Sequence, residues 1–172
     1  MLRNLLVLAT ASLMAMNSLN AETLLIPGVS GIPDQQGNKN VSTGCITNVP
    51  TGTMVVGILV NPNCLASYPI SLPVGSTIDT VEVAYHNVYN GPQQPSIAAY
   101  LAKHSFVPET NAIAVAATNT VFGGQSPSLQ HLYMPALGMP SLSIPVLPDE
   151  IFWVQVTTSY ITEICSITLR YH

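Results

Sequence analysis

A few carboxylate and imidazole side chains near the middle of the chain are the residues best able to do chemistry. Glu82 and His86 fall on the same, outward face of a predicted strand. Four residues along a strand span about 13 Å, too far for both side chains to bind one metal ion or share one proton. Each would need partners from elsewhere, such as His104, Lys103 or Glu109. A hydrolase site around Glu82, His86 and His104 is one hypothesis, and a solvated strand face is the other.

Motifs typical of metal, phosphate or nucleophile chemistry do not occur in the sequence. There is no His-x-His or His-Glu-x-x-His spacing, and His131 and His172 are isolated, so neither a metal site nor another cofactor is predicted. Residues 124–128, the segment most similar to a nucleophile elbow, lack the second glycine of the Gly-x-Ser-x-Gly pattern. Asp149-Glu150 indicates a turn. The sequence predicts no catalytic residue and favours a protein that is not an enzyme.

Aromatic side chains are better candidates for ligand binding. They are Tyr85, Tyr89, Tyr100 and Trp153, and exposed rings of this kind stack on sugars or anchor a protein partner. Tyr89 lies in a predicted loop, whereas Tyr85 is core if it points inward with its apolar neighbours. Trp153 alternates out of phase with Phe152, so Tyr89 and Trp153 are the predicted ligand-binding residues. The alternative is that both faces of the Trp153 strand are covered.

These side chains must be positioned by strands, because apolar and polar residues alternate with a period of two. Residues 80–87 and 97–101 both show this alternation, and Asn90-Gly91-Pro92 between them favours a turn. The two segments are predicted to form an antiparallel pair. Further strands are predicted at residues 23–26, 41–48, 53–60, 112–118, 130–137, 142–144, 151–158 and 164–171.

The fold predicted from these strands is all-β. No stretch shows helical periodicity over more than two turns, and the 14 prolines separate short strands. Such a pattern predicts a single antiparallel β-sandwich of Greek-key or jelly-roll type. We assign the sandwich to residues 44–172 and an irregular segment to residues 22–43, with no second domain or internal repeat.

The first residues indicate export. Residues 1–21 combine Arg3, an apolar run and a final small residue, Ala21, which is the pattern of a signal peptide and is too short to span a bilayer comfortably. Without these residues the chain has three Lys and Arg residues and eight Asp and Glu residues, which gives a net charge of −5. This balance argues against a nucleic-acid partner, which would require a cationic surface. The mature protein is expected to be secreted or periplasmic, with no membrane span.

Three cysteines remain in what should be an oxidising compartment. Cys45 and Cys64 flank a predicted strand, so a disulfide between them is predicted, although the sequence alone does not fix the connectivity. Cys165 alternates in phase with Ile167, Leu169 and Tyr171. This phase predicts an inert position in the core.

The order of these features resembles that of small secreted bacterial β-sandwich proteins with no assigned activity. The resemblance rests on Gly44-Cys45, on the Pro-x-x-Leu-Pro-x-Gly-Ser-x-Ile turn at residues 69–78, and on the closing strand at residues 167–171. It spans residues 44–171 and implies a fold and a compartment. It implies no catalytic residues.

Three functional hypotheses follow. The first is an exported, non-enzymatic module of the envelope or extracellular space, which contacts an unknown protein partner or associates with itself as a homo-oligomer. The second is a glycan-binding module that uses Tyr89 or Trp153. The third is the hydrolase around Glu82, His86 and His104.

Overall fold

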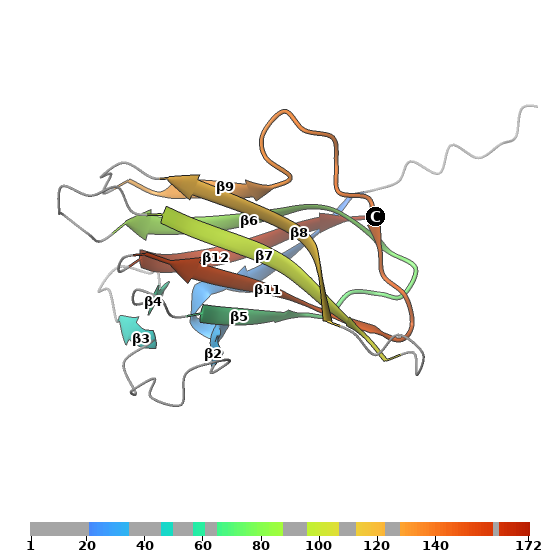
Figure 1. Ribbon diagram of the computed structural model, residues 1–172, viewed down its shortest axis with the longest axis horizontal. Coiled ribbons are helices and arrows are strands. Elements are labelled where there is room, and N and C mark those ends of the chain that lie inside the picture. Colours follow the sequence, from blue (N-terminus) through green and yellow to red (C-terminus); the bar gives the residue numbers. More distant parts are fainter. Residues whose placement is uncertain are drawn as a thin grey trace, which may run out of the picture.

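Two antiparallel sheets make up almost all the regular structure in the computed structural model of the chain (Figure 1). It describes residues 21–34, 46–49, 57–60, 65–87, 96–106, 113–122, 128–159 and 162–172. Within these ranges the only helical element is a short 3-10 helix, η1 (Gly28–Ser30). The predicted all-β sandwich is therefore confirmed. Among the same residues, no helix is long and apolar enough to cross a membrane.

The first sheet, sheet A, is built around two long strands, β6 and β12. Its order is β10-β6-β12-β4-β3, with β1 also paired to β12 and β9 to β6. The strands are β1 (Glu22–Pro27), β3 (Ile46–Val49), β4 (Gly57–Val60), β6 (Thr77–Asn87), β9 (Gln130–Met134), β10 (Ile144–Pro145) and β12 (Thr162–Tyr171).

The second sheet, sheet B, has β11 at its centre and the order β2-β5-β11-β7-β8. Its strands are β2 (Ile32–Asp34), β5 (Leu65–Ile70), β7 (Ser96–Ser105), β8 (Ile113–Phe122) and β11 (Glu150–Thr158). In Figure 1, β7 and β8 cross in front of β6 and β12, so the two sheets are stacked. Both β1 and β2 lie within residues 22–43, and this segment thus contributes a strand to each sheet.

The core lies between the sheets and follows the alternation seen in the sequence. On β6 the side chains of Val81, Val83 and Tyr85 are at most 1% exposed, and on β11 Val154 and Val156 are fully buried. Burying one such aliphatic side chain is worth about 1.5–3 kcal/mol. The facing apolar rows therefore hold the layers together, and Tyr85 is a core residue that no ligand can reach.

The predicted antiparallel pair of residues 80–87 and 97–101 is wrong. β6 pairs with β12, β9 and β10 in sheet A, whereas β7 pairs with β11 and β8 in sheet B. Each strand has one apolar face, and two strands can bury those faces against each other from opposite layers as well as side by side in one sheet. The local pattern does not distinguish these arrangements.

The predicted inward row of β12 is interrupted at Cys165. The pairing of β12 with β6 shifts between Ile164 and Ser166, so Cys165 is an extra residue in a β-bulge. Its side chain is half-buried and is not part of the core, whereas Ile167 is fully buried. The bulge moves Cys165 out of phase with the core residues that follow it. The predicted inert core position is therefore wrong.

Some predictions fall on residues outside the described ranges. Residues 1–20 of the predicted signal peptide do so, as do Cys45, Cys64 and Tyr89. The signal peptide, the disulfide and the role of Tyr89 stay predictions.

Candidate ligand-binding face

The outward side chains of sheet B form a surface that combines aromatic, amide and hydroxyl groups. Trp153 and Gln155 of β11 alternate with the buried Phe152, Val154 and Val156, so they point away from the core. The strand register places neighbours of β5 and β7 directly beside them. The centre of this surface, hereafter the sheet B face, consists of Ser67, Pro69, Tyr100, Ala102, Trp153 and Gln155.

Trp153 is half-buried, as is Tyr100, so each ring retains a part that solvent can reach. Ala102 is directly opposite Trp153 and is only 1% exposed although it lies on the outward side. An outward alanine that is buried must be covered by neighbouring side chains, and its cross-strand neighbours are Trp153 and Val115. Trp153 is therefore one of the side chains placed to cover Ala102, and part of its ring remains accessible to solvent.

Polar groups stand next to the two rings. Gln155 is the direct cross-strand neighbour of both Tyr100 and Ser67, and its Nε2 donates a long hydrogen bond of 3.5 Å to the hydroxyl of Ser67. Tyr100 is diagonal to Trp153, a relation that places Cα atoms about 7–8 Å apart. The six residues include no carboxylate, ammonium, guanidinium or imidazole group. The sheet B face is thus suited to a neutral ligand that offers both apolar and hydrogen-bonding groups.

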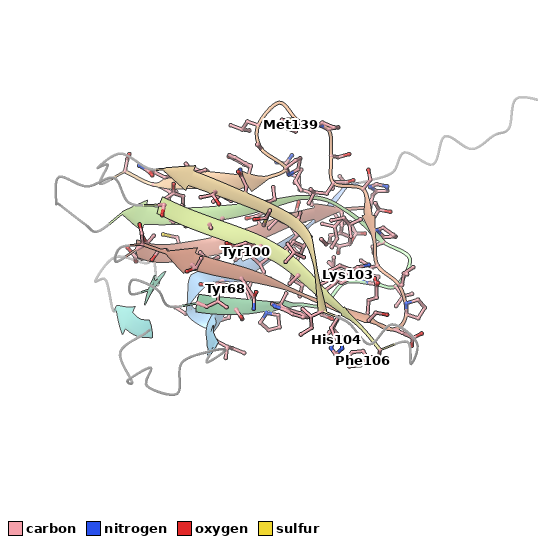
Figure 2. The ribbon with its side chains drawn as sticks, in the orientation of Figure 1. Tyr68, Tyr100, Lys103, His104, Phe106 and Met139 are labelled. Atoms are coloured by element: carbon pink, nitrogen blue, oxygen red, sulfur yellow. The ribbon has the colours of Figure 1, made fainter. Side chains whose placement is uncertain are left out.

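One end of sheet B is more apolar than the centre. Figure 2 shows His104 and Phe106 at the end of β7, away from Tyr100. Their ring centroids are 4.5 Å apart. Ile113 and Ile151 are the cross-strand neighbours of His104 on its two sides. Ile113 is 59% exposed, Ile151 is 49% exposed and Phe106 is 54% exposed. This end could receive another apolar surface.

The structure does not bring the three residues of the hydrolase hypothesis together. His104 is on sheet B, while Glu82 and His86 are on sheet A. The carboxylate of Glu82 bonds with Nδ1 of His131, and His86 Nδ1 lies 3.2 Å from Oε2 of Glu163. Sequence reasoning missed both partners, because they are set by the long-range register of β9 and β12.

The outer side of sheet A carries these ionisable groups. Its named residues, hereafter the sheet A face, are Glu82, His86, His131, Tyr133, Glu163 and Arg170. Desolvation and, next, the carboxylate of Glu82 raise the pKa of Tyr133. A hollow of about 320 Å³ lies beside Tyr133, lined also by Glu82, Arg170 and the loop at residues 135–141. The charges of this face are largely engaged with one another.

Comparisons with known proteins give a fold and no family. No family model matches the sequence, and no curated protein does. Among solved structures, the chain is similar to the N-terminal CBM22-1–GH10 modules of endo-1,4-β-D-xylanase 10B from Clostridium thermocellum, complexed with xylohexaose. The TM-score is 0.54 at 12% identity, and the match covers 88% of this chain and 28% of that one.

Two further similar structures have lower scores. One is the C-terminal CBM6 of LamC from Zobellia galactanivorans, with a TM-score of 0.49, 12% identity and coverage of 86% of this chain and 98% of that one. The other is the xylan-binding module CBM15, with a TM-score of 0.47, 10% identity and coverage of 87% and 95%. At such identities the likeness of the xylanase chain shows the β-sandwich fold alone.

Proposed function

We propose that the protein is an exported, non-catalytic module that binds a neutral glycan through the sheet B face. The observation that carries this proposal is the half-buried Trp153, whose side chain is on the outward side of sheet B beside Tyr100 and Gln155. The predicted signal peptide supports export to the periplasm or outside the cell, where polysaccharides are found.

The chemistry of the face fits a sugar chain. A pyranose ring has apolar C–H faces that pack on an indole or phenol ring, while its hydroxyl groups need hydrogen-bonding partners around the rim. Trp153 and Tyr100 offer the rings, and Gln155 and Ser67 offer the amide and the hydroxyl. Because none of these groups is charged, a neutral polysaccharide fits better than an acidic one.

The xylanase chain with the TM-score of 0.54 contains a carbohydrate-binding module and was solved with xylohexaose. This neighbour supports glycan binding as the class of function. It does not identify the sugar for this chain, since fold alone does not determine the ligand.

Calorimetric titration of the purified protein tests the proposal. The ligands are neutral hexasaccharides of β-1,4-linked xylose, β-1,4-linked glucose and β-1,3-linked glucose, with an oligogalacturonate as the acidic comparison. At least one neutral chain should bind, and Trp153→Ala should weaken it at least about tenfold, or about 1.4 kcal/mol. The matched control is Tyr133→Ala, which removes a half-buried aromatic from sheet A. The proposal fails if neither variant, or only the control, loses affinity.

A second candidate function is self-association through β8. This strand is at the edge of sheet B, and its outward Ile113 and Val115 are 59% and 58% exposed. An exposed edge strand with apolar side chains is a template for pairing with a second chain. Light scattering after size exclusion should then give a dimer, and Val115→Lys should give a monomer. A monomeric wild-type protein would contradict this second candidate and leave glycan binding unaffected.

A further inference from the structure

Three potential metal ligands of different chemistry meet where β6 and β12 run side by side in sheet A (Figure 1). They are Nδ1 of His86, a carboxylate oxygen of Glu163 and Sγ of Cys165, and all lie within 4.8 Å of one another. His86 Nδ1 is 3.2 Å from Glu163 Oε2 and 3.8 Å from Cys165 Sγ. The three atoms thus surround one point in space.

The fold builds this arrangement from two features of β12. Glu163 is the direct cross-strand partner of His86, so their side chains project together from the same side of the sheet. The bulge between Ile164 and Ser166 then inserts Cys165 next to this pair. Without the bulge, Cys165 would alternate in phase with the buried Ile167, and its thiol would point into the core.

Among the described residues, the surroundings of Glu163 lack a hydrogen-bond donor for one of its carboxylate oxygens. Its side chain is only 10% exposed, and within the described part of the chain its Oε1 has no hydrogen-bond partner although it is buried. A buried carboxylate oxygen without a partner is costly, unless a cation or a donor approaches it. A cation that the carboxylate also contacts through Oε1 would satisfy it.

A nucleophilic role for Cys165 does not fit this geometry. In a catalytic triad, the acid and the nucleophile contact different nitrogens of the histidine ring, whereas here both contact Nδ1 of His86. In addition, burial and then the nearby Glu163 raise the pKa of Cys165 to about 11. In the absence of a cation the sulfur is therefore a protonated thiol at neutral pH, which is a poor nucleophile.

We propose that His86, Glu163 and Cys165 bind one Zn²⁺ ion and leave its fourth position open. A tetrahedral zinc site with these ligands requires about 3.4 Å between nitrogen and oxygen and about 3.6 Å between nitrogen and sulfur. The observed nitrogen–oxygen and nitrogen–sulfur distances are 3.2 Å and 3.8 Å, and the oxygen and sulfur atoms lie within 4.8 Å of each other. A sulfur ligand with an imidazole selects zinc over Ca²⁺ or Mg²⁺, which prefer oxygen.

The site is separate from the sheet B face, because it lies on the other sheet. A metal ion held there would link β6 to β12, the pair at the centre of sheet A, and metal that binds only the folded state stabilises that state. Zinc binding and glycan binding therefore succeed or fail independently of each other.

The test is a calorimetric titration of the metal-free, reduced protein with zinc chloride alone. One equivalent should bind per chain, and Cys165→Ser and Glu163→Gln should each weaken binding at least about tenfold. The matched control is His131→Gln, because His131 pairs with Glu82 on the same sheet and is not one of the three proposed ligands. This control should bind zinc as the wild-type protein does.

Cobalt gives a second measurement of the same site. Co²⁺ bound to the wild-type protein and to His131→Gln should show the ultraviolet charge-transfer band of a cobalt–thiolate bond, and Cys165→Ser should lack it. If Glu163→Gln does not fold, Cys165→Ser alone is sufficient for the test, because the substitution is conservative and Cys165 is only half-buried. The proposal is overturned if no saturable zinc binding occurs, or if Cys165→Ser retains full affinity, since other side chains would then hold the ion.

Discussion

The two sheets share one apolar core but present outer faces of opposite character. The sheet B face has two accessible rings with neutral polar neighbours, whereas the sheet A face consists mostly of ionisable side chains. The four histidines show the difference most clearly. On sheet A and at its end, His86, His131 and His172 each contact a carboxylate, while His104 on sheet B contacts the ring of Phe106.

The comparison of the two faces shows that the alternation of apolar and polar residues and the types of the outward residues give separate information. Alternation determines which side chains point outward, and it does so equally for β6 in sheet A and β11 in sheet B. The outward residue types then decide what each face can do. A neutral aromatic face can bind a sugar from solution, whereas a face of ionisable side chains is better suited to holding an ion or stabilising the sheet.

The largest effect that would sharpen the comparison concerns the ion pair of Lys103 and Glu150 in sheet B. Lys103 Nζ donates to Glu150 Oε1 at 2.6 Å, and the Glu150 side chain is only 5% exposed. Lys103→Met should lower the free energy of unfolding by about 2–3 kcal/mol, because it leaves a buried carboxylate without its partner. Denaturant unfolding measures this loss. A double variant that also carries Glu150→Gln should recover part of it, and a loss below about 0.5 kcal/mol would mean that the pair is solvated.

Alkaline pH should act on the shared core, where two buried tyrosines lie. Burial raises the pKa values of Tyr68 and Tyr85 above the ordinary value of 10.0. The folded state therefore holds these protons more tightly than the unfolded state, so the stabilisation is complete below pH 10 and is lost as the pH rises above it. We expect the free energy of unfolding to fall by up to about 1.4 kcal/mol per pH unit for each such tyrosine.

Tyr68→Phe separates the contribution of one tyrosine. Figure 2 places Tyr68 on β5, and among the described residues its buried hydroxyl has no hydrogen-bond partner. Removal of that hydroxyl should raise stability at neutral pH by about 1 kcal/mol and make the alkaline loss less steep. Denaturant unfolding at pH 7 and pH 11 provides both numbers. Equal slopes for the two proteins would contradict the burial of this hydroxyl.

The smallest effect is expected for an exposed pair on sheet A. His131 is 37% exposed and pairs with Glu82, which is 25% exposed. His131→Gln should change the free energy of unfolding by less than about 1 kcal/mol, because solvent screens such pairs. It should leave glycan affinity unchanged. A loss of sugar binding in this variant would move the ligand site to sheet A.

The sequence predicted those parts of the fold that depend on local patterns. The strand expected at residues 151–158 is β11, from Glu150 to Thr158, and its alternation already placed Trp153 opposite to Phe152. The assignment of strands to sheets was out of reach, because β6 pairs with β12 about eighty residues further along the chain. β5 was not anticipated, since its six residues include Pro69 and gave a weak pattern.

The candidate sites differ in the same way. Trp153 was identified from alternation within one strand, but its neighbours Tyr100 and Ser67 depend on the register of three strands. The meeting of His86, Glu163 and Cys165 needs both that register and a bulge. No spacing motif encodes a bulge, so the sequence reasoning predicted no metal site and placed Cys165 in the core.

The chain contains a single tryptophan, Trp153, and its fluorescence is the most direct test of the central claim. Titration with a neutral hexasaccharide that binds by calorimetry should produce a saturable change in Trp153 emission with the same dissociation constant, because the sugar covers the exposed part of the indole. Zn²⁺ alone should not produce it. Calorimetric binding of the sugar without any change in Trp153 emission would contradict the assignment of the ligand to the sheet B face.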